Sequence, residues 1–130
     1  MTSILALNFN RPAETKLCLE SIKKNALFSH ETILVNNGGE DHGEIFKYFQ
    51  DGLIDKLLLC KTGTGGGRGT VDAFNLSLTE FSMWIETDSE LNVAIDRDTI
   101  ENWKHFLQTN NNKCIDLTGG ICGNNIYSGR

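Results

Sequence analysis

The sequence predicts an α/β fold in which helices cover a mostly parallel sheet. Short apolar runs, typical of buried strands, alternate with segments whose apolar residues recur at helical spacing. A strand and the helix after it together take about thirty residues, as in βαβ units, which build parallel sheets with right-handed connections. The chain has 130 residues, 39% of them hydrophobic and 22% charged, which predicts one globular domain over residues 1–130.

The predicted strands are apolar runs bounded by residues that favour turns. Each run is too short for a typical helix, and Asn, Gly or acidic residues follow most of them. In chain order the strands span residues 4–9, 31–36, 56–61, 83–85 and 114–117, and a further strand is expected within residues 121–127.

The predicted helices follow these turns and keep an apolar face. Pro12 suits the first turn of a helix, so the first one begins at residue 13. In the second, Ile45, Phe46 and Phe49 are expected on one face. In order, the helices cover residues 13 to 25 or 27, residues 44–51, residues 71–79, and a segment that Asp96 or Asp98 caps and that ends near residue 109.

The turns after four of the strands carry the polar and glycine-rich residues of the chain. Parallel sheets bind ligands at the carboxyl ends of their strands, so these turns are expected to meet at one edge. They are residues 8–11, 36–41, 62–70 and 86–90.

An acidic cluster follows the strand predicted over residues 83–85. Glu86 and Asp88 are two residues apart, a spacing that directs both side chains to the same side of an extended chain. Divalent cations that hold a diphosphate need one or two such carboxylates. We therefore expect Asp88 and Glu86 to bind a metal and Glu90 to be solvated, although an isolated acid pair of this kind more often marks a polar turn.

A glycine run over residues 62–70 precedes the third helix. Backbone N–H groups of Gly66 and Gly67 could approach a phosphate, and Arg68 could pair with a diphosphate. The run matches neither the P-loop pattern nor the dinucleotide fingerprint. A flexible connector with a solvated arginine is the alternative.

Asparagines end the first and second strands. Asn36 and Asn37 could bind a base edge, since an amide offers a donor and an acceptor, or could simply form a turn. Asp41 could cap the next helix or touch a ligand. Of Asn8, Asn10 and Arg11, one is expected to line the base or ribose, while Arg11 more plausibly pairs with an acid across the sheet edge.

The remaining composition narrows the function classes. A net charge of −5 and a pI of about 5.1 argue against double-stranded nucleic acid as a partner. No basic leader and no apolar run of membrane-spanning length is found, so a cytoplasmic protein without a membrane span is expected. The four cysteines and three histidines lack metal-site spacing, and we expect reduced thiols and histidines used for packing or at the surface.

Taken in order, these motifs resemble the family 2 glycosyltransferases of the GT-A fold, in their nucleotide-sugar-binding N-terminal part. Residues 4–12 (ILALNFNRP) and 18–22 (CLESI) are similar to the first strand, its F-N-R-P turn and the following helix of that family. Residues 32–41 (TILVNNGGED) are similar to its second strand and acidic turn. The glycine run and residues 85–88 (IETD) stand where the family has a glycine segment and its D-x-D motif.

The resemblance implies a Rossmann-like GT-A three-layer sandwich, here truncated. It implies binding of a nucleotide-diphosphate sugar with Mn²⁺ or Mg²⁺, and inverting transfer of the sugar to an acceptor hydroxyl. The metal would be held by Asp88 with help from Glu86. The nucleotide-binding residues would be Asn8, Phe9, Asn10, Arg11, Asn36, Asn37, Gly66, Gly67, Arg68 and Thr87.

The chain departs from the family pattern at three points. Asn36 replaces an aspartate, Glu86 replaces the first acid of D-x-D, and Gly39 replaces a serine. The resemblance ends near residue 91, before the half that holds the acceptor site and the catalytic base, so no catalytic residue is assigned. A fragment, or a minimal form that obtains its acceptor half from a partner or a second copy, is expected. A nucleotidyltransferase, or a binding or interaction domain without turnover, is the alternative.

Overall fold

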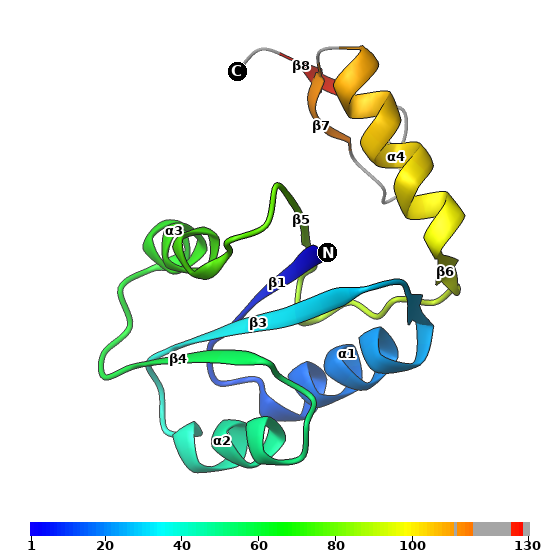
Figure 1. Cartoon of the computed structure of the whole chain (residues 1–130). Helices are drawn as coiled ribbons and strands as arrows, with labels where there is room; N and C mark the ends of the chain where they lie inside the picture. The colour runs from blue at the N-terminus through cyan, green and yellow to red at the C-terminus, as the bar shows by residue number, and fades with distance from the viewer. Residues whose placement is uncertain (111, 116–125, 129–130) are drawn as a thin grey trace. The chain divides into compact units, whose positions relative to one another are not determined.

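A computed structural model describes residues 1–110, 112–115 and 126–128 (Figure 1). The chain divides into two compact units, Met1–Ile95 and Asp96–Arg130, and each is described by itself. None of the helices in the described ranges is long and apolar enough to cross a membrane.

The elements follow the predicted alternation of strands and helices. The strands are β1 Thr2–Asn8, β2 Ala26–Leu27, β3 His30–Asn37, β4 Lys56–Cys60, β5 Phe81–Trp84, β6 Ile95–Asp96, β7 Asn112–Ile115 and β8 Ile126–Ser128. The helices are α1 Pro12–Asn25, α2 His42–Gln50, α3 Gly66–Leu76 and α4 Arg97–Thr109.

The main sheet of the first unit has the strand order β4-β3-β1-β5, and all of its pairings are parallel. Leu5 of β1 lies opposite Ile33 of β3 on one side and opposite Trp84 of β5 on the other. A hydrogen-bonded central strand of this kind is buried on both faces, which explains the unbroken apolar run of β1. The predicted α/β class with a mostly parallel sheet is confirmed.

Helices cover both faces of this sheet and form a three-layer arrangement (Figure 1). On one face, Leu19 of α1 and Ile45 of α2 pack with Ala6 and Leu34 of the sheet. On the other face, Ala73 of α3 packs with a second set of strand residues, Leu5, Ile33 and Val35. Side chains alternate along each strand, so neighbouring residues serve different faces.

Two details of the predicted helices are wrong. In α2 the buried residues are Ile45 and Tyr48, while Phe46 and Phe49 are exposed and stack on each other. Helix α3 begins at Gly66, five residues before the predicted start at residue 71. The apolar pattern begins at Val71, but the first turn of a helix needs no apolar residue, so the pattern could not locate this end. The short strand β2 was not predicted either.

In the second unit, Asp96 caps α4 by accepting a hydrogen bond from the backbone N–H of Thr99 at 2.8 Å. Of the two predicted caps, Asp96 and Asp98, the first is therefore the one that the structure shows. This bond lowers the pKa of Asp96. Strands β7 and β8 pair antiparallel. The predicted strand within residues 121–127 overlaps β8, but its first part and Cys122 lie outside the described residues.

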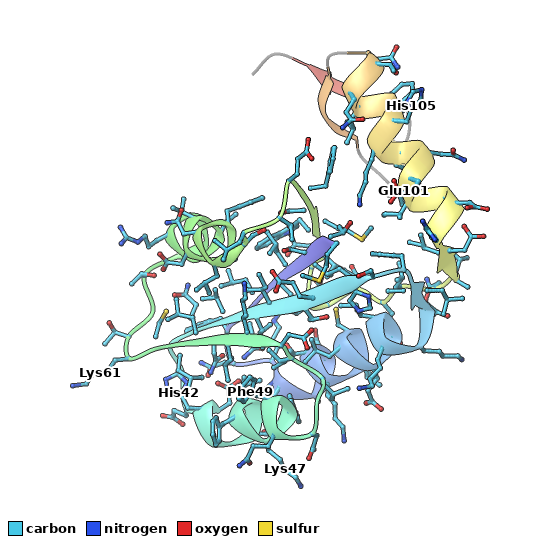
Figure 2. The ribbon with its side chains drawn as sticks, viewed as in Figure 1. His42, Lys47, Phe49, Lys61, Glu101 and His105 are labelled. Atoms are coloured by element: carbon cyan, nitrogen blue, oxygen red, sulfur yellow. The ribbon has the colours of Figure 1, made fainter. Side chains whose placement is uncertain are left out.

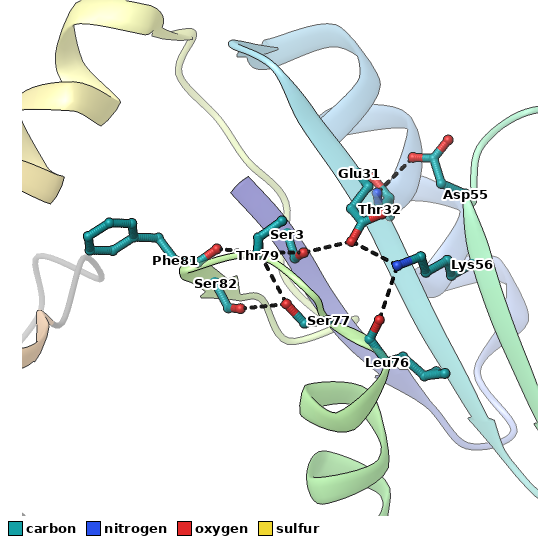
Figure 3. Close-up of polar contacts among 10 residues, drawn as sticks. All are labelled: Ser3, Glu31, Thr32, Asp55, Lys56, Leu76, Ser77, Thr79, Phe81 and Ser82. Atoms are coloured by element: carbon teal, nitrogen blue, oxygen red, sulfur yellow. Dashed lines mark hydrogen bonds and ion pairs between the residues drawn. The ribbon is translucent and has the colours of Figure 1, made fainter. Parts of the chain in front are cut away.

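A polar network fastens the amino-terminal edge of the main sheet, opposite the strand-end turns (Figure 3). Lys56 Nζ lies 3.2 Å from the carboxylate of Glu31 and donates to the carbonyl of Leu76, the last residue of α3, at 3.1 Å. Ser3 Oγ donates to the same carboxylate. The last turn of α3 is thereby attached to β3 and β4.

Candidate functional site

The turns after β1, β3, β4 and β5 lie at one edge of the sheet because all these strands run parallel. From β1 the chain proceeds to β3 and β4 on one side, and then crosses back to β5 on the other side of β1. The carboxyl ends of β1 and β5 therefore flank the point where the strand order reverses. Ligands of open α/β sheets bind in the crevice at such a point.

Asn8 ends β1 and is the centre of a buried polar network, here called the strand-end network. Its Nδ2 donates to Asn36 Oδ1 at 2.7 Å and to Asp41 Oδ2 at 2.8 Å. Its Oδ1 accepts from the hydroxyl of Thr15 at 2.6 Å and from the backbone N–H of Arg11 at 3.3 Å. Asn8 is fully buried, so this amide connects three segments rather than contacting solvent.

Asn36 completes the network from the end of β3. Its Nδ2 donates to Asp41 Oδ1 at 3.1 Å and approaches His42 Nδ1 at 2.7 Å. Nδ1 accepts in this arrangement, which assigns the ring proton to Nε2. His42 begins α2 at this edge (Figure 2). Asn36 is fully buried and its side chain holds the turn, in line with the second of the two expectations for it.

Asp41 resolves the choice between capping and another role. It occupies the N-cap position of α2, but its side chain makes no capping hydrogen bond. Both carboxylate oxygens accept from amides instead, from Asn8 and from Asn36. Asp41 therefore satisfies one N–H of each of the two buried amides, Asn8 and Asn36, in the strand-end network.

Asn37, the next residue, points to the opposite face and contacts the glycine run. Its Oδ1 accepts from the backbone N–H of Thr64 at 3.1 Å and from the Thr64 hydroxyl at 2.9 Å. Its Nδ2 donates to the carbonyl of Gly65 at 2.9 Å. Asn37 is 4% exposed, and its partners Thr64 and Gly65 are both exposed.

The turn after β3 and the glycine run approach each other closely. Gly38 has a φ of +86°, and a Cβ there would lie 2.4 Å from the backbone nitrogen of Gly63. A side chain would thus be strained and would separate the two segments. Gly69 also lies at a close approach, since a Cβ there would lie 2.6 Å from Leu7 Cδ1, where α3 packs on β1, and the Leu7 side chain would have to shift.

The acidic segment after β5 is fixed by β1. The backbone N–H of Ile85 donates to Leu5 O at 3.0 Å, and the hydroxyl of Thr87 donates to Leu7 O at 3.0 Å. Thr87 is buried, and its side chain anchors this turn to β1. The chain then turns, with Ser89 N–H donating to Glu86 O.

Asp88 and Glu86 have different partners, contrary to the expectation that they point the same way. Arg11 Nη1 lies 3.8 Å from Asp88 Oδ2 and 3.5 Å from the carboxylate of Glu14. Glu86 Oε1 instead accepts from the indole N–H of Trp84 at 2.9 Å. Strand β5 ends at Trp84, so the alternation of a strand does not extend to Asp88. The predicted pairing of Arg11 with an acid across the sheet edge is confirmed.

The other predicted residues lie around this edge. Phe9 and Asn10 are exposed after β1, and Asn10, with φ of +53°, accepts from the N–H of Glu40 at 3.2 Å. Gly66 and Gly67 form the first turn of α3, with open space where a Cβ would be. Arg68 pairs with Asp72 one turn later at 3.3 Å.

A buried thiol lies beneath the acidic turn. Cys18 Sγ approaches the carbonyl of Glu86 at 3.7 Å. Burial, together with the charges of Glu90 and Asp88, raises the pKa of Cys18 to about 12. The thiol therefore stays protonated and serves packing, as was expected of the cysteines.

Sequence reasoning missed Thr15 and His42 as members of the site. Thr15 is fully buried and lies seven residues after Asn8. Only its position on the inner face of α1 could have indicated its hydrogen bond to Asn8. For His42, the adjacent Asp41 was the signal. Within the described residues no group of three or more His, Cys, Asp or Glu side chains could hold a metal by itself.

The sheet order and the helices on both of its faces define a Rossmann-like α/β domain. Neither a protein-family model nor a curated protein sequence matches the chain. Among solved structures, S. aureus TarS is similar, with a TM-score of 0.66 and 16% identity over 86% of this chain. TarS 1-349 is similar with a TM-score of 0.63 and 19% identity over 83% of this chain. The complex of TarS 1-349 with UDP is similar with a TM-score of 0.62 and 18% identity over 83% of this chain.

The likeness concerns the fold, since the identities are low. The chain spans 20% of the first TarS chain and 32% of each TarS 1-349 chain, the one with UDP included.

Proposed function

We propose that this chain binds a nucleotide-diphosphate sugar with Mn²⁺ or Mg²⁺, as the donor-binding part of an inverting family 2 glycosyltransferase with the GT-A fold. One observation carries the proposal: Arg11 after β1 and Asp88 after β5 lie 3.8 Å apart where the strand order reverses. A cationic and an anionic side chain side by side at this point suit a metal and a diphosphate. The complex of TarS 1-349 with UDP supports a nucleotide ligand for this fold.

The donor set fits a divalent cation that the ligand helps to hold. Asp88 is about half exposed, and its distance of 3.8 Å from Arg11 exceeds that of a direct hydrogen bond, so the carboxylate remains open to a cation. Mg²⁺ typically takes one or two carboxylates and completes its shell with phosphate and water. Asp88 would be the direct ligand, and Glu86, held by Trp84, would act through water. The metal would offset the charge of the leaving diphosphate.

Cationic and backbone groups at the same edge of the sheet would hold the phosphates. Arg11 would turn from Asp88 to the diphosphate once a metal is bound. The first N–H groups of α3, from Gly66 and Gly67, have no side-chain cap and are favourable to an anion. Arg68 is exposed and would pair with the diphosphate after leaving its partner Asp72.

For the base, Asn37 is a better candidate than Asn36. The partners of Asn36 are buried or half-buried side chains, whereas those of Asn37 belong to an exposed loop. Phe9 is 54% exposed, and its ring lies 3.5 Å from where a Cβ on Gly63 of the same loop would be, so the ring could stack on a base. Asn8, Asn10 and Thr87 would hold the surrounding turns.

Transfer to an acceptor hydroxyl requires an acceptor site and a general base in addition to the donor site. A donor-binding domain without turnover is the alternative, and a nucleotidyltransferase a more distant one. Hydrolysis or transfer assays on a sugar nucleotide distinguish the first alternative, because binding without turnover favours it. A cytoplasmic location remains part of this proposal.

Calorimetric titration with UDP, GDP and dTDP, with and without Mn²⁺, tests the proposal. We expect Mn²⁺ to strengthen binding of at least one of them, and Asp88→Asn to abolish this metal dependence without unfolding the protein. Asp51→Asn, an exposed aspartate at the end of α2, is the matched control and should retain it. Absence of metal-dependent binding to all three nucleotides contradicts the proposal, and retained Mn²⁺ dependence in Asp88→Asn shows that the metal lies elsewhere.

A further inference from the structure

The amide of Asn37 is engaged at both its oxygen and its nitrogen by the loop that follows β4. A donor from Thr64 and an acceptor from Gly65 occupy its two halves, as the hydrogen-bonding edge of a nucleobase would. The Thr64 hydroxyl adds a second donor to the same oxygen. In this state Oδ1 has no acceptor site left for a base, and one N–H of Nδ2 is used by Gly65.

The loop is built so that it can release this amide. Residues 61–68 are all exposed, and a Cβ on Gly65, Gly66 or Gly67 would meet nothing within 4 Å. Residues 62 and 63 lie close to Gly38, but few packing contacts oppose a movement of residues 64–67. The strand-end network behaves differently, because Asn8, Thr15 and Asn36 are fully buried.

We propose that residues 62–65 form a latch whose Thr64 and Gly65 occupy Asn37 in place of a nucleobase, so that a nucleotide binds only when the latch opens. This inference rests on the proposed function and adds a regulation of the same site. The observed affinity is then the affinity of the open form reduced by the fraction of molecules that are open. Weakening the latch without touching Asn37 raises the affinity.

Thr64→Val tests the latch because it removes the hydroxyl and keeps the shape of the side chain. Thr70→Val is the matched control: the Thr70 hydroxyl donates to Gly66 O at 2.8 Å within α3 and has no contact with Asn37. Calorimetric titration with UDP and GDP in the presence of Mn²⁺ compares the variants with the unaltered protein. We expect Thr64→Val to bind about two- to tenfold more tightly, the factor that corresponds to one net hydrogen bond, and Thr70→Val to bind as the unaltered protein does.

The outcomes separate the latch from the proposed function. Equal or weaker binding by Thr64→Val overturns the latch alone, because it means that the loop supports the bound nucleotide or plays no part. Absence of binding in all three proteins overturns the proposed function and the latch together. Binding by Thr64→Val only supports both. Amide hydrogen exchange of residue 64 in the free proteins gives a second measurement, and we expect faster exchange in Thr64→Val.

Discussion

Asn8→Ala is expected to lower the free energy of unfolding by about 3 kcal/mol, because the amide is the centre of the strand-end network. Its bonds to Asn36 and Thr15 are neutral and contribute about 1 kcal/mol each, and its bond to the Asp41 carboxylate contributes about 1.5–3 kcal/mol. The longer bond from the Arg11 N–H adds little, since Arg11 is exposed. A water molecule in the space of the lost amide recovers part of the sum.

Urea unfolding followed by circular dichroism measures this loss. With a slope of about 1.5 kcal/mol/M, the midpoint should fall by about 2 M. Asn75→Ala removes the same atoms from an exposed position of α3 and should change stability by less than about 0.5 kcal/mol. A loss below about 1 kcal/mol for Asn8→Ala would refute the reasoning, since water would then replace the buried amide at little cost.

Two further outcomes are expected. Gly38→Ala should lower the free energy of unfolding, measured in urea, by at least about 2 kcal/mol, because of its positive φ and the clash with Gly63. Gly43→Ala is the control, since a Cβ there meets open space in α2, and should be neutral or stabilising. Equal effects of the two substitutions would contradict the close approach of Gly38 to Gly63. At pH 8 a thiol reagent should modify Cys60 before Cys18, because the pKa of Cys18 is about 12 and its thiol is buried. Cys18 should react only when the protein unfolds. Equal rates of modification of the two cysteines would contradict the burial of Cys18.

The sequence was sufficient to predict the sheet, because apolar runs and helical spacing identify buried strands and amphipathic helices directly. It was also sufficient to predict that the strand-end turns share an edge and that Arg11 pairs with an acid there. The separate roles of Asn36 and Asn37 could have been predicted from the alternation of β3, since consecutive residues serve opposite faces.

The remaining features depend on contacts between segments far apart in the chain. The start of α3 could not be predicted, because glycine is a poor helix former and Gly69 is present for its approach to Leu7. The direction of Glu86 depends on the indole of Trp84, and that of Asp88 on a turn after β5. A local sequence pattern does not predict these contacts.

The attachment of α3 by Lys56 has a mechanical consequence. The helix is tied to β3 and β4 at Leu76, its carboxyl end, while its glycine end at Gly66 borders the site. Eleven residues at 1.5 Å each give a lever of about 16 Å. A tilt of about 10° around Leu76 would therefore carry the Gly66 end through about 3 Å. The pivot lies at the opposite edge of the sheet from the strand-end turns, so a small rotation there displaces the Gly66 end most.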